Sequence, residues 1–321
     1  MTELTHSKTF DEHVRRFNQQ RDTYNEMLKA RRSPHTERSY ITDIKDFFNY
    51  FGSKPSQEVV LEFVRLSKIE ATGLVLDWKN HLKDRGLKES SINRKIGSIK
   101  ALVKYFNDVG FSDWVLTAEA LTCKRIEKYR DTTGLSATEI EKILSFPDRG
   151  TFKGKRDYAM LKLLWGNALR RAEVVAIDIE DIDFSDRSLW ILGKGRTEKV
   201  KVFMNKSTNT AVREWVDARI SRDSSCSGPL FISLGGRSRG ERLTDQSVYE
   251  LVTRTSKDAG TSKVISPHQI RHSSITRALE LTGGDVRKVQ KLSRHKNLDT
   301  LMIYDDGLQK LQAEITDLLD D

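Results

Sequence analysis

The interpretation of this chain starts from one stretch, SPHQIRHSSITRALELTGGDVRKVQKLSRHKNLDTLMIYDD, which spans residues 266–306. Ser266 can cap the free N–H groups of a helix start, and the ring of Pro267 fits the first helical turn. Gly283 and Gly284 are typical of a helix end. We therefore expect a helix that begins at Pro267 and ends before this glycine pair.

Polar side chains suited to phosphate chemistry recur along the same stretch. His268 and Arg271 stand three residues apart, so they share a face close to the positively polarised start of the first helix. A second helix over 285–293 is expected to deliver His295, and a third to carry Tyr304. Arginine and imidazole donors can bind phosphate oxygens, and a phenol can attack phosphorus. Together they suggest a phosphodiester substrate.

Each residue also has an ordinary interpretation. A single histidine such as His268 or His295 is more often a hydrogen-bonded structural residue. His268 and His272 also stand four apart, as in the helix of zinc proteases. However, Gln269 occupies the position of the glutamate base, and Arg271 would repel a dication, so no metal site is predicted.

The joint spacing separates these alternatives. His268-x-x-Arg271, His295 and a tyrosine nine residues later, Tyr304, resemble the tyrosine recombinase (phage integrase) family, whose C-terminal motifs are H-x-L-R-H, L-G-H and that tyrosine. The chain departs from the pattern at Ser293-Arg294, where L-S-R-H stands in the region of the leucine and glycine of L-G-H. That departure concerns the local turn rather than a catalytic atom.

Two further motifs extend the resemblance. The sequence GNALRRAE resembles the family's T-G-L-R-I-S-E box, with Asn167-Ala168 in place of Thr-Gly. Arg170 then matches the catalytic arginine, and its spacing to Glu173 favours it over Arg171. Alternating residues around a G-K-G turn predict a β-hairpin. Its tip, Lys194, is ordinarily a solvated turn lysine, but the family places its catalytic lysine there.

The first part of the chain is expected to be helical and basic in character. The net charge of +9 suggests a polyanionic partner without proving one. Apolar residues at helical spacing predict a helix over 92–106, and Thr36 can cap an earlier one. Basic residues on and after the helix over 92–106 are either a solvated face or candidate DNA contacts: Arg94, Lys95, Lys100, Lys104, Lys124 and Arg125.

The expected fold is mainly α with a small antiparallel β-sheet (α+β). The predicted parts are an N-terminal helical extension (1–32), a helical core-binding domain (33–122), a linker (123–134) and a catalytic domain with a C-terminal tail helix (135–321). The resemblance covers about residues 35–305, and Ser91-Ile-Asn-Arg94 matches the family's core-binding domain. Two cysteines and no apolar run of membrane-spanning length predict a cytoplasmic, nucleoid-associated protein.

The resemblance implies a site-specific recombinase, or integrase, that cuts and rejoins double-stranded DNA through a 3′-phosphotyrosyl intermediate, with no cofactor, ATP or metal. Tyr304 would be the nucleophile, with Arg170, Lys194, His268, Arg271 and His295 as the other catalytic residues. The protein would act as a homo-oligomer on DNA, a tetramer in the synaptic complex, with the tail docking in trans. The alternatives are a type IB topoisomerase, a non-catalytic DNA-binding protein and a zinc hydrolase.

Overall fold

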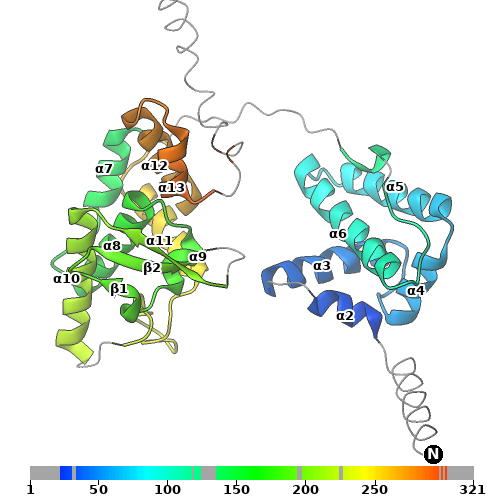
Figure 1. Ribbon diagram of the computed structural model, residues 1–321, viewed down its shortest axis with the longest axis horizontal. Helices are drawn as coiled ribbons and strands as arrows, with labels where there is room; N and C mark the ends of the chain where they lie inside the picture. The colour runs from blue at the N-terminus through cyan, green and yellow to red at the C-terminus, as the bar shows by residue number, and fades with distance from the viewer. Residues whose placement is uncertain are drawn as a thin grey trace, which may run out of the picture. The chain divides into compact units, whose positions relative to one another are not determined.

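The computed structural model describes residues 22–30, 34–117, 119–123, 135–193, 197–223, 227–295, 298 and 301. The chain divides into two compact units, Met1–Tyr129 and Arg130–Asp321 (Figure 1). Each unit has a hydrophobic core of its own. The architecture is mainly helical with one small antiparallel sheet, which confirms the predicted fold class. The predicted domain boundaries stay a prediction.

The first unit is a bundle of helices that follow one another closely. Its described elements are α2 (Thr23–Lys29), α3 (Pro34–Tyr50), α4 (Gln57–Arg65), α5 (Lys68–Asp84), α6 (Glu89–Asp108) and the 3-10 helix η1 (Glu119–Leu121). Ser67 starts α5 because its hydroxyl accepts from the backbone N–H of Glu70, whose carboxylate accepts from Ser67 in return. The expected cap at Thr36 is wrong, because α3 already begins at Pro34 and Thr36 lies inside it.

The core of the first unit confirms the predicted apolar face of α6. Ile92, Ile96 and Ile99 are buried, and they pack with Phe47 and Trp78 of the neighbouring helices. Three residues of α2 join the same core, namely Tyr24, Met27 and Leu28. The helix within the predicted N-terminal extension therefore packs on the first core.

Asn93 ties the end of the first unit to α6. Its side-chain amide donates to the carbonyl of Cys123 at 3.0 Å, and its amide oxygen accepts from the N–H of Cys123 at 2.8 Å. This two-way contact fixes the backbone at Cys123, the last residue described before position 135.

The second unit combines helices with the sheet. Its described elements are α7 (Ala137–Ser145), α8 (Phe152–Gly166), α9 (Arg171–Ala176), the 3-10 helix η2 (Ile179–Asp181), β1 (Ile182–Asp183), β2 (Ser188–Leu192), β3 (Lys199–Phe203), α10 (Lys206–Asp223), α11 (Asp245–Asp258), α12 (Pro267–Leu281) and α13 (Val286–Ser293). The strands pair antiparallel in the order β1-β2-β3. The hairpin predicted from the alternating pattern is confirmed, with Trp190 opposite Lys201.

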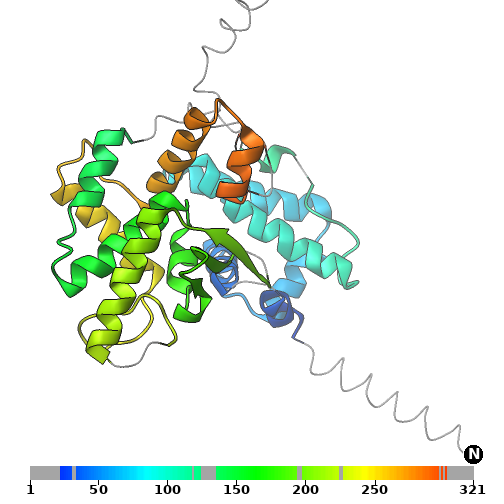
Figure 2. The same cartoon turned by 60° about the vertical axis from the view of Figure 1, so that its left-hand side comes forward.

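Helix α8 lies at the centre of the second unit. It packs against α10 and α12, and Figure 2 shows α10 running beside it. Residues such as Leu161, Leu164 and Trp215 are fully buried in the shared core. Burial on several sides explains why apolar residues dominate the second half of α8, from Tyr158 to Trp165, as expected for a central helix.

The ends of α12 follow the predicted signals. Ser266 caps its start through the N–H of Gln269, and Pro267 occupies the first turn. Gly283 and Gly284 follow its end with φ angles of 59° and 82°, in the left-handed region that glycine adopts without strain. In α13 the carboxylate of Asp285 accepts from the N–H of Lys288.

The segment that enters the second unit is fastened to α12. The N–H of Leu135 donates to Ser273 Oγ on α12 at 2.7 Å. The Glu139 carboxylate, at the start of α7, accepts from the Ser262 hydroxyl at 2.6 Å in the loop before α12. That bond, with the helix-capping bond from the Ser136 backbone, lowers the pKa of Glu139 to about 2.

None of the helices among the described residues is both long and apolar enough to span a membrane. The described part of the chain also holds no group of three or more His, Cys, Asp or Glu residues placed to share a metal ion.

Candidate active site

The loop between α8 and α9 positions Arg170. Ala168 in this loop is fully buried and has a φ angle of +46°, so a non-glycine residue stands in the left-handed region at the position of the family's glycine. Arg170 directly precedes α9, and Glu173 accepts from its backbone N–H at 2.9 Å. The same carboxylate binds Arg170 Nη1 at 2.7 Å, which fixes the guanidinium relative to the helix start.

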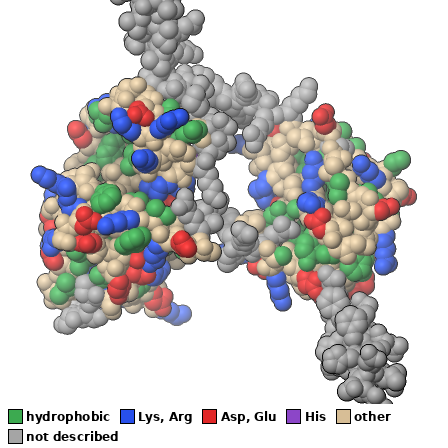
Figure 3. All heavy atoms as spheres, viewed as in Figure 1, with side chains coloured by type: hydrophobic (Ala, Val, Ile, Leu, Met, Phe, Trp, Pro, Cys, Tyr) green, Lys and Arg blue, Asp and Glu red, His purple; other side chains and the backbone are tan. Residues whose placement is uncertain are grey.

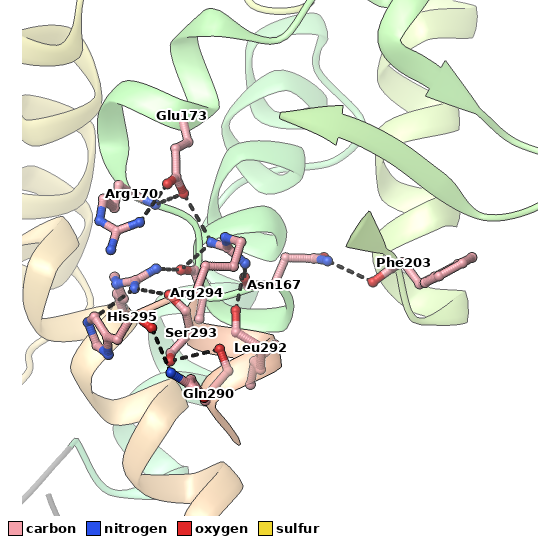
Figure 4. A network of polar contacts seen from close by, with 11 residues as sticks. Asn167, Arg170, Glu173, Phe203, Gln290, Leu292, Ser293, Arg294 and His295 are labelled. Atoms are coloured by element: carbon pink, nitrogen blue, oxygen red, sulfur yellow. Dashed lines mark hydrogen bonds and ion pairs between the residues drawn. The ribbon is translucent and has the colours of Figure 1, made fainter. Parts of the chain in front are cut away.

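Arg171, the rival to Arg170, contacts another element. Its Nε lies 3.2 Å from an oxygen of Asp245 at the start of α11. The two neighbouring arginines therefore have different surroundings, and Arg170 is the one whose side chain lies in the network of Figure 4.

Arg271 is the buried member of the site. It lies on α12 and is only 2% exposed. Its Nη1 donates to the carbonyl of Ala168 and its Nη2 to the carbonyl of Ser293. Its Nη2 is also 3.4 Å from His295 Nε2. One guanidinium thus joins the α8–α9 loop, α12 and the end of α13, which lie up to 125 positions apart in the chain.

The two predicted histidines come from adjacent elements. His268 is exposed in the first turn of α12, one turn before Arg271. His295 follows α13, and its carbonyl accepts from the Gln290 amide at 3.0 Å. Figure 4 shows the His295 ring and the Arg170 side chain on the same side of the network. Arg170, Arg271 and His295 are therefore brought together.

The charges around His295 favour its neutral form. Burial is the largest cause, followed by the positive charges of Arg271, Arg170 and Arg294 and the nearby His268, and together they lower the pKa of His295 to about 4. At neutral pH the imidazole of the free protein therefore carries no charge, and one ring nitrogen donates while the other accepts.

Glu173 balances part of this positive charge. Burial raises the pKa of its carboxyl group, but the Arg294 charge and the hydrogen bonds from Arg170 outweigh burial and lower the pKa below its ordinary value. The carboxylate is only 2% exposed and ionised, as its two arginine partners require.

Four of the predicted site residues lie outside the described residues. They are Lys194, Tyr304, Lys124 and Arg125. Lys194 falls between β2 and β3, so the confirmed hairpin brackets its position in the chain. The predicted tail helix after Tyr304 also lies outside the described residues.

The candidate DNA contacts on α6 differ in their surroundings. Lys95 is held inside the unit, with a side chain only 12% exposed and paired with Asp43 and Asp46. Arg94 also pairs with Asp43 but remains half exposed. Lys100 is half-buried and donates to the Thr122 hydroxyl at 3.4 Å, whereas Lys104 is exposed and pairs with Asp108 at 3.0 Å. Figure 3 shows Lys and Arg side chains on the surfaces of both units, with Asp and Glu among them.

The sequence reasoning did not assign roles to two residues that hold the site together. The Asn167 amide donates to the carbonyl of Phe203 at 2.8 Å and links the α8–α9 loop to β3. Arg294 binds both Glu173 and the carbonyls of that loop. Both residues stand where the chain departs from the family motifs, so these departures were the feature of the sequence that could have pointed to their roles.

This arrangement suits an anion. Two guanidinium groups and a neutral imidazole converge from three elements, and such donors bind the non-bridging oxygens of a phosphodiester. A dication is poorly matched by these positive neighbours.

Both units of the chain match known protein families. The sequence pattern described as "Phage integrase family" matches residues 134–310, and "Phage integrase, N-terminal SAM-like domain" matches residues 22–108. A tyrosine recombinase of Synechococcus elongatus is 42% identical over 300 residues, covering 93% of this chain and 92% of the relative.

Two solved structures share the fold. XerH site-specific recombinase, bound to a palindromic difH substrate in a post-cleavage complex, matches with a TM-score of 0.65 and 19% identity, over 89% of this chain and 80% of that one. A lambda integrase dimer bound to a core site matches with a TM-score of 0.59 and 18% identity, over 86% and 94%.

Proposed function

The chain belongs to the phage integrase family, and from this membership we propose a residue-level mechanism centred on Tyr304. The protein is a site-specific tyrosine recombinase that acts on DNA. The observation that carries the residue-level mechanism is the convergence of Arg170, Arg271 and His295 on one place from segments far apart in the sequence.

In the proposed reaction the Tyr304 phenol oxygen attacks the scissile phosphorus. A P–O bond forms to the tyrosine, and the bond to the 5′-oxygen breaks, leaving a 3′-phosphotyrosyl linkage and a free 5′-hydroxyl. His268 takes the phenolic proton, and Lys194 gives a proton to the leaving 5′-oxygen. A 5′-hydroxyl of the exchanging strand then reverses these steps and releases the tyrosine. The phosphodiester energy is retained throughout, so the scheme uses no ATP.

The arginines stabilise the charge that develops on phosphorus. Arg170 and Arg271 hold the non-bridging oxygens, and His295 adds a hydrogen-bond donor. Removing one donor of this kind costs about 3 kcal/mol of barrier, or roughly a hundredfold in rate. Two backbone carbonyls fix the plane of the Arg271 guanidinium before the substrate arrives. Such preorganisation is what makes a donor effective in the transition state.

The relatives suggest how the protein assembles. XerH and lambda integrase have been solved on DNA, the latter as a dimer. We expect this chain to bind double-stranded DNA as a homo-oligomer, a tetramer in the synaptic complex, with the segment after Tyr304 docking on the neighbouring copy. The proposed location is the cytoplasm, at the nucleoid. Arg94, Lys95, Lys100, Lys104, Lys124 and Arg125 remain candidate DNA contacts, although Lys95 would have to leave Asp43 and Asp46 to reach a phosphate.

A trapping experiment tests the nucleophile. The purified full chain is incubated with fragmented genomic DNA of its host and denatured, and the DNA linked to protein is recovered and sequenced at the junction. We expect one recurring junction sequence and a phosphotyrosyl peptide that contains Tyr304. Tyr304→Phe should give no adduct, whereas Tyr249→Phe, on the exposed side of α11, should react like the parent. An adduct in Tyr304→Phe would refute the assignment, and no adduct from any version would indicate a silent DNA-binding protein.

A further inference from the structure

Arg294 occupies an unusual place in the second unit. It ends α13 with φ 56° and ψ 32°, the left-handed conformation that glycine adopts most easily. An arginine there carries a conformational cost that glycine avoids. Its side chain nevertheless turns inward and is only 11% exposed. The hydrogen bonds of the Arg294 guanidinium offset this conformational cost.

The guanidinium of Arg294 fastens the α8–α9 loop to the end of α13. Its Nη1 donates to the Asn167 carbonyl at 3.2 Å and to the Leu292 carbonyl at 2.6 Å. Its Nη2 donates to the Ala168 carbonyl at 3.1 Å. Figure 4 shows this group at the centre of the network, between the loop that carries Arg170 and the turn that carries His295.

The same Nη2 also lies 3.0 Å from Glu173 Oε2. The other oxygen, Oε1, binds Arg170 Nη1 at 2.7 Å. The two arginine side chains therefore bind one oxygen each of this buried carboxylate, and Oε2 also accepts from the Arg170 backbone N–H at 2.9 Å. Without Arg294, Oε2 would keep only the bond from the Arg170 backbone N–H, and its remaining acceptor capacity would be open to the Arg170 guanidinium, in the two-pronged pairing that guanidinium and carboxylate prefer. That pairing would draw the Arg170 guanidinium toward Glu173 and away from a bound phosphate.

We propose that Arg294 is a positioning residue for DNA cleavage: it occupies one oxygen of Glu173 and so keeps Arg170 turned toward the substrate while it clamps the loop to the turn that carries His295. This role rests on the proposed function of Arg170. It would not be available to a family member with the motif's glycine, because Arg294 stands at that position.

The test compares two arginine-to-glycine variants of the full chain. Arg187 is also an arginine with a left-handed φ, 52°, but it lies exposed in the turn between β1 and β2. Both replacements put glycine at a position with a left-handed φ, so the comparison tests the buried side-chain contacts of Arg294. The assay measures adduct formation in a single turnover on a duplex carrying the recovered junction sequence, together with the Kd for that duplex.

We expect Arg294→Gly to slow adduct formation between about tenfold and a hundredfold, the scale of a displaced catalytic group, with little change in Kd. Arg187→Gly should match the parent. Arg294→Lys, which keeps a charge near Glu173, should lie between the parent and Arg294→Gly. A parent protein that forms no adduct would contradict the proposed function itself. Arg294→Gly as fast as the parent would overturn only the positioning role.

A double-mutant cycle separates positioning from a general loss of structure. If Arg294 acts through Glu173, Arg294→Gly should slow the reaction far less in the Glu173→Gln background than in the parent. Equal effects in both backgrounds would overturn the proposal. The pKa of His295 gives a readout without DNA: it should rise in Arg294→Gly, because one of the positive charges that lower it is removed. An unchanged pKa would count against the clamp.

Discussion

Replacing Glu173 by glutamine is expected to destabilise the second unit strongly. The carboxylate is 2% exposed, and its partners Arg170 and Arg294 have side chains that are 31% and 11% exposed. Removing one member of a buried ion pair costs about 3–5 kcal/mol, because the remaining charge stays buried without a partner. Arg170 can recover some hydration, so we expect the lower end, about 3 kcal/mol.

Thermal unfolding of the full chain measures this effect. For a unit of this size 1 kcal/mol corresponds to about 2–4 °C, so the transition of the second unit should fall by roughly 6–12 °C. The matched control is Glu214→Gln, since Glu214 pairs with Arg149 at 2.7 Å on the surface. Surface pairs contribute about 1 kcal/mol or less. Equal shifts for Glu173→Gln and Glu214→Gln would refute the reasoning.

The same variant changes the response to acid. The pKa of Glu173 is lower in the folded protein than its ordinary value of 4.5. Its contribution to stability is therefore present above the pKa of the unfolded chain and is lost as the pH falls through the folded value. In Glu173→Gln this part of the acid dependence should disappear, and an unchanged acid dependence would contradict the lowered pKa.

Three further outcomes are expected. In the free protein the His295 ring should titrate near pH 4 when followed by NMR. Its pKa should rise when DNA is bound, because the negative charge of a phosphate favours the protonated ring. A pKa near 6.5 in the free protein would contradict the described effect of burial and of the neighbouring positive charges. Asp43→Asn should destabilise the first unit by about 3 kcal/mol, because the buried Asp43 carboxylate pairs with the side chains of Arg94 and Lys95. Lys104→Ala is the control and should have little effect on unfolding, because the Lys104–Asp108 pair is exposed. Asn93→Ala should lower the free energy of unfolding by about 1–3 kcal/mol, because the backbone N–H and carbonyl of Cys123 lose their partners. Hydrogen exchange at the Cys123 N–H should accelerate, and an unchanged exchange rate would argue against the Asn93–Cys123 contact.

Local signals were sufficient for much of the fold. Ser266, Pro267 and the glycine pair predicted both ends of α12, because capping depends on residues close to the helix end. The alternation on either side of the G-K-G turn predicted β2 and β3 for a similar reason. The start of α3 at Pro34 differed from the expected cap at Thr36, since proline itself suits a first turn.

Long-range contacts were beyond the sequence reasoning. Lys95 looked like a phosphate contact on a basic helix, but Asp43 and Asp46 lie 52 and 49 positions away and hold it inside the unit. Helix α10 was not predicted, because a polar sequence conceals the few apolar residues, such as Trp215, that pack on α8. Such pairings depend on the whole chain.

The structural roles of the residues that depart from the family motifs could not be predicted from the sequence. Ala168 and Arg294 stand in left-handed conformations where the motifs have glycine. Nothing in their own side chains predicts that backbone. The conformations become understandable only with the Arg271 and Arg294 guanidinium groups bound to the carbonyls of the loop.

The fastening of Leu135 to Ser273 has a mechanical consequence. Ser273 lies two residues after Arg271 on the same helix, and the Glu139–Ser262 bond holds the loop that leads to His268. Leu135 is thus tied to α12 by a side-chain contact as well as to α7 along the chain, so a pull on Leu135 would act on both helices. If Arg271 binds phosphate as proposed, a displacement of Leu135 would reach it through less than one turn of α12.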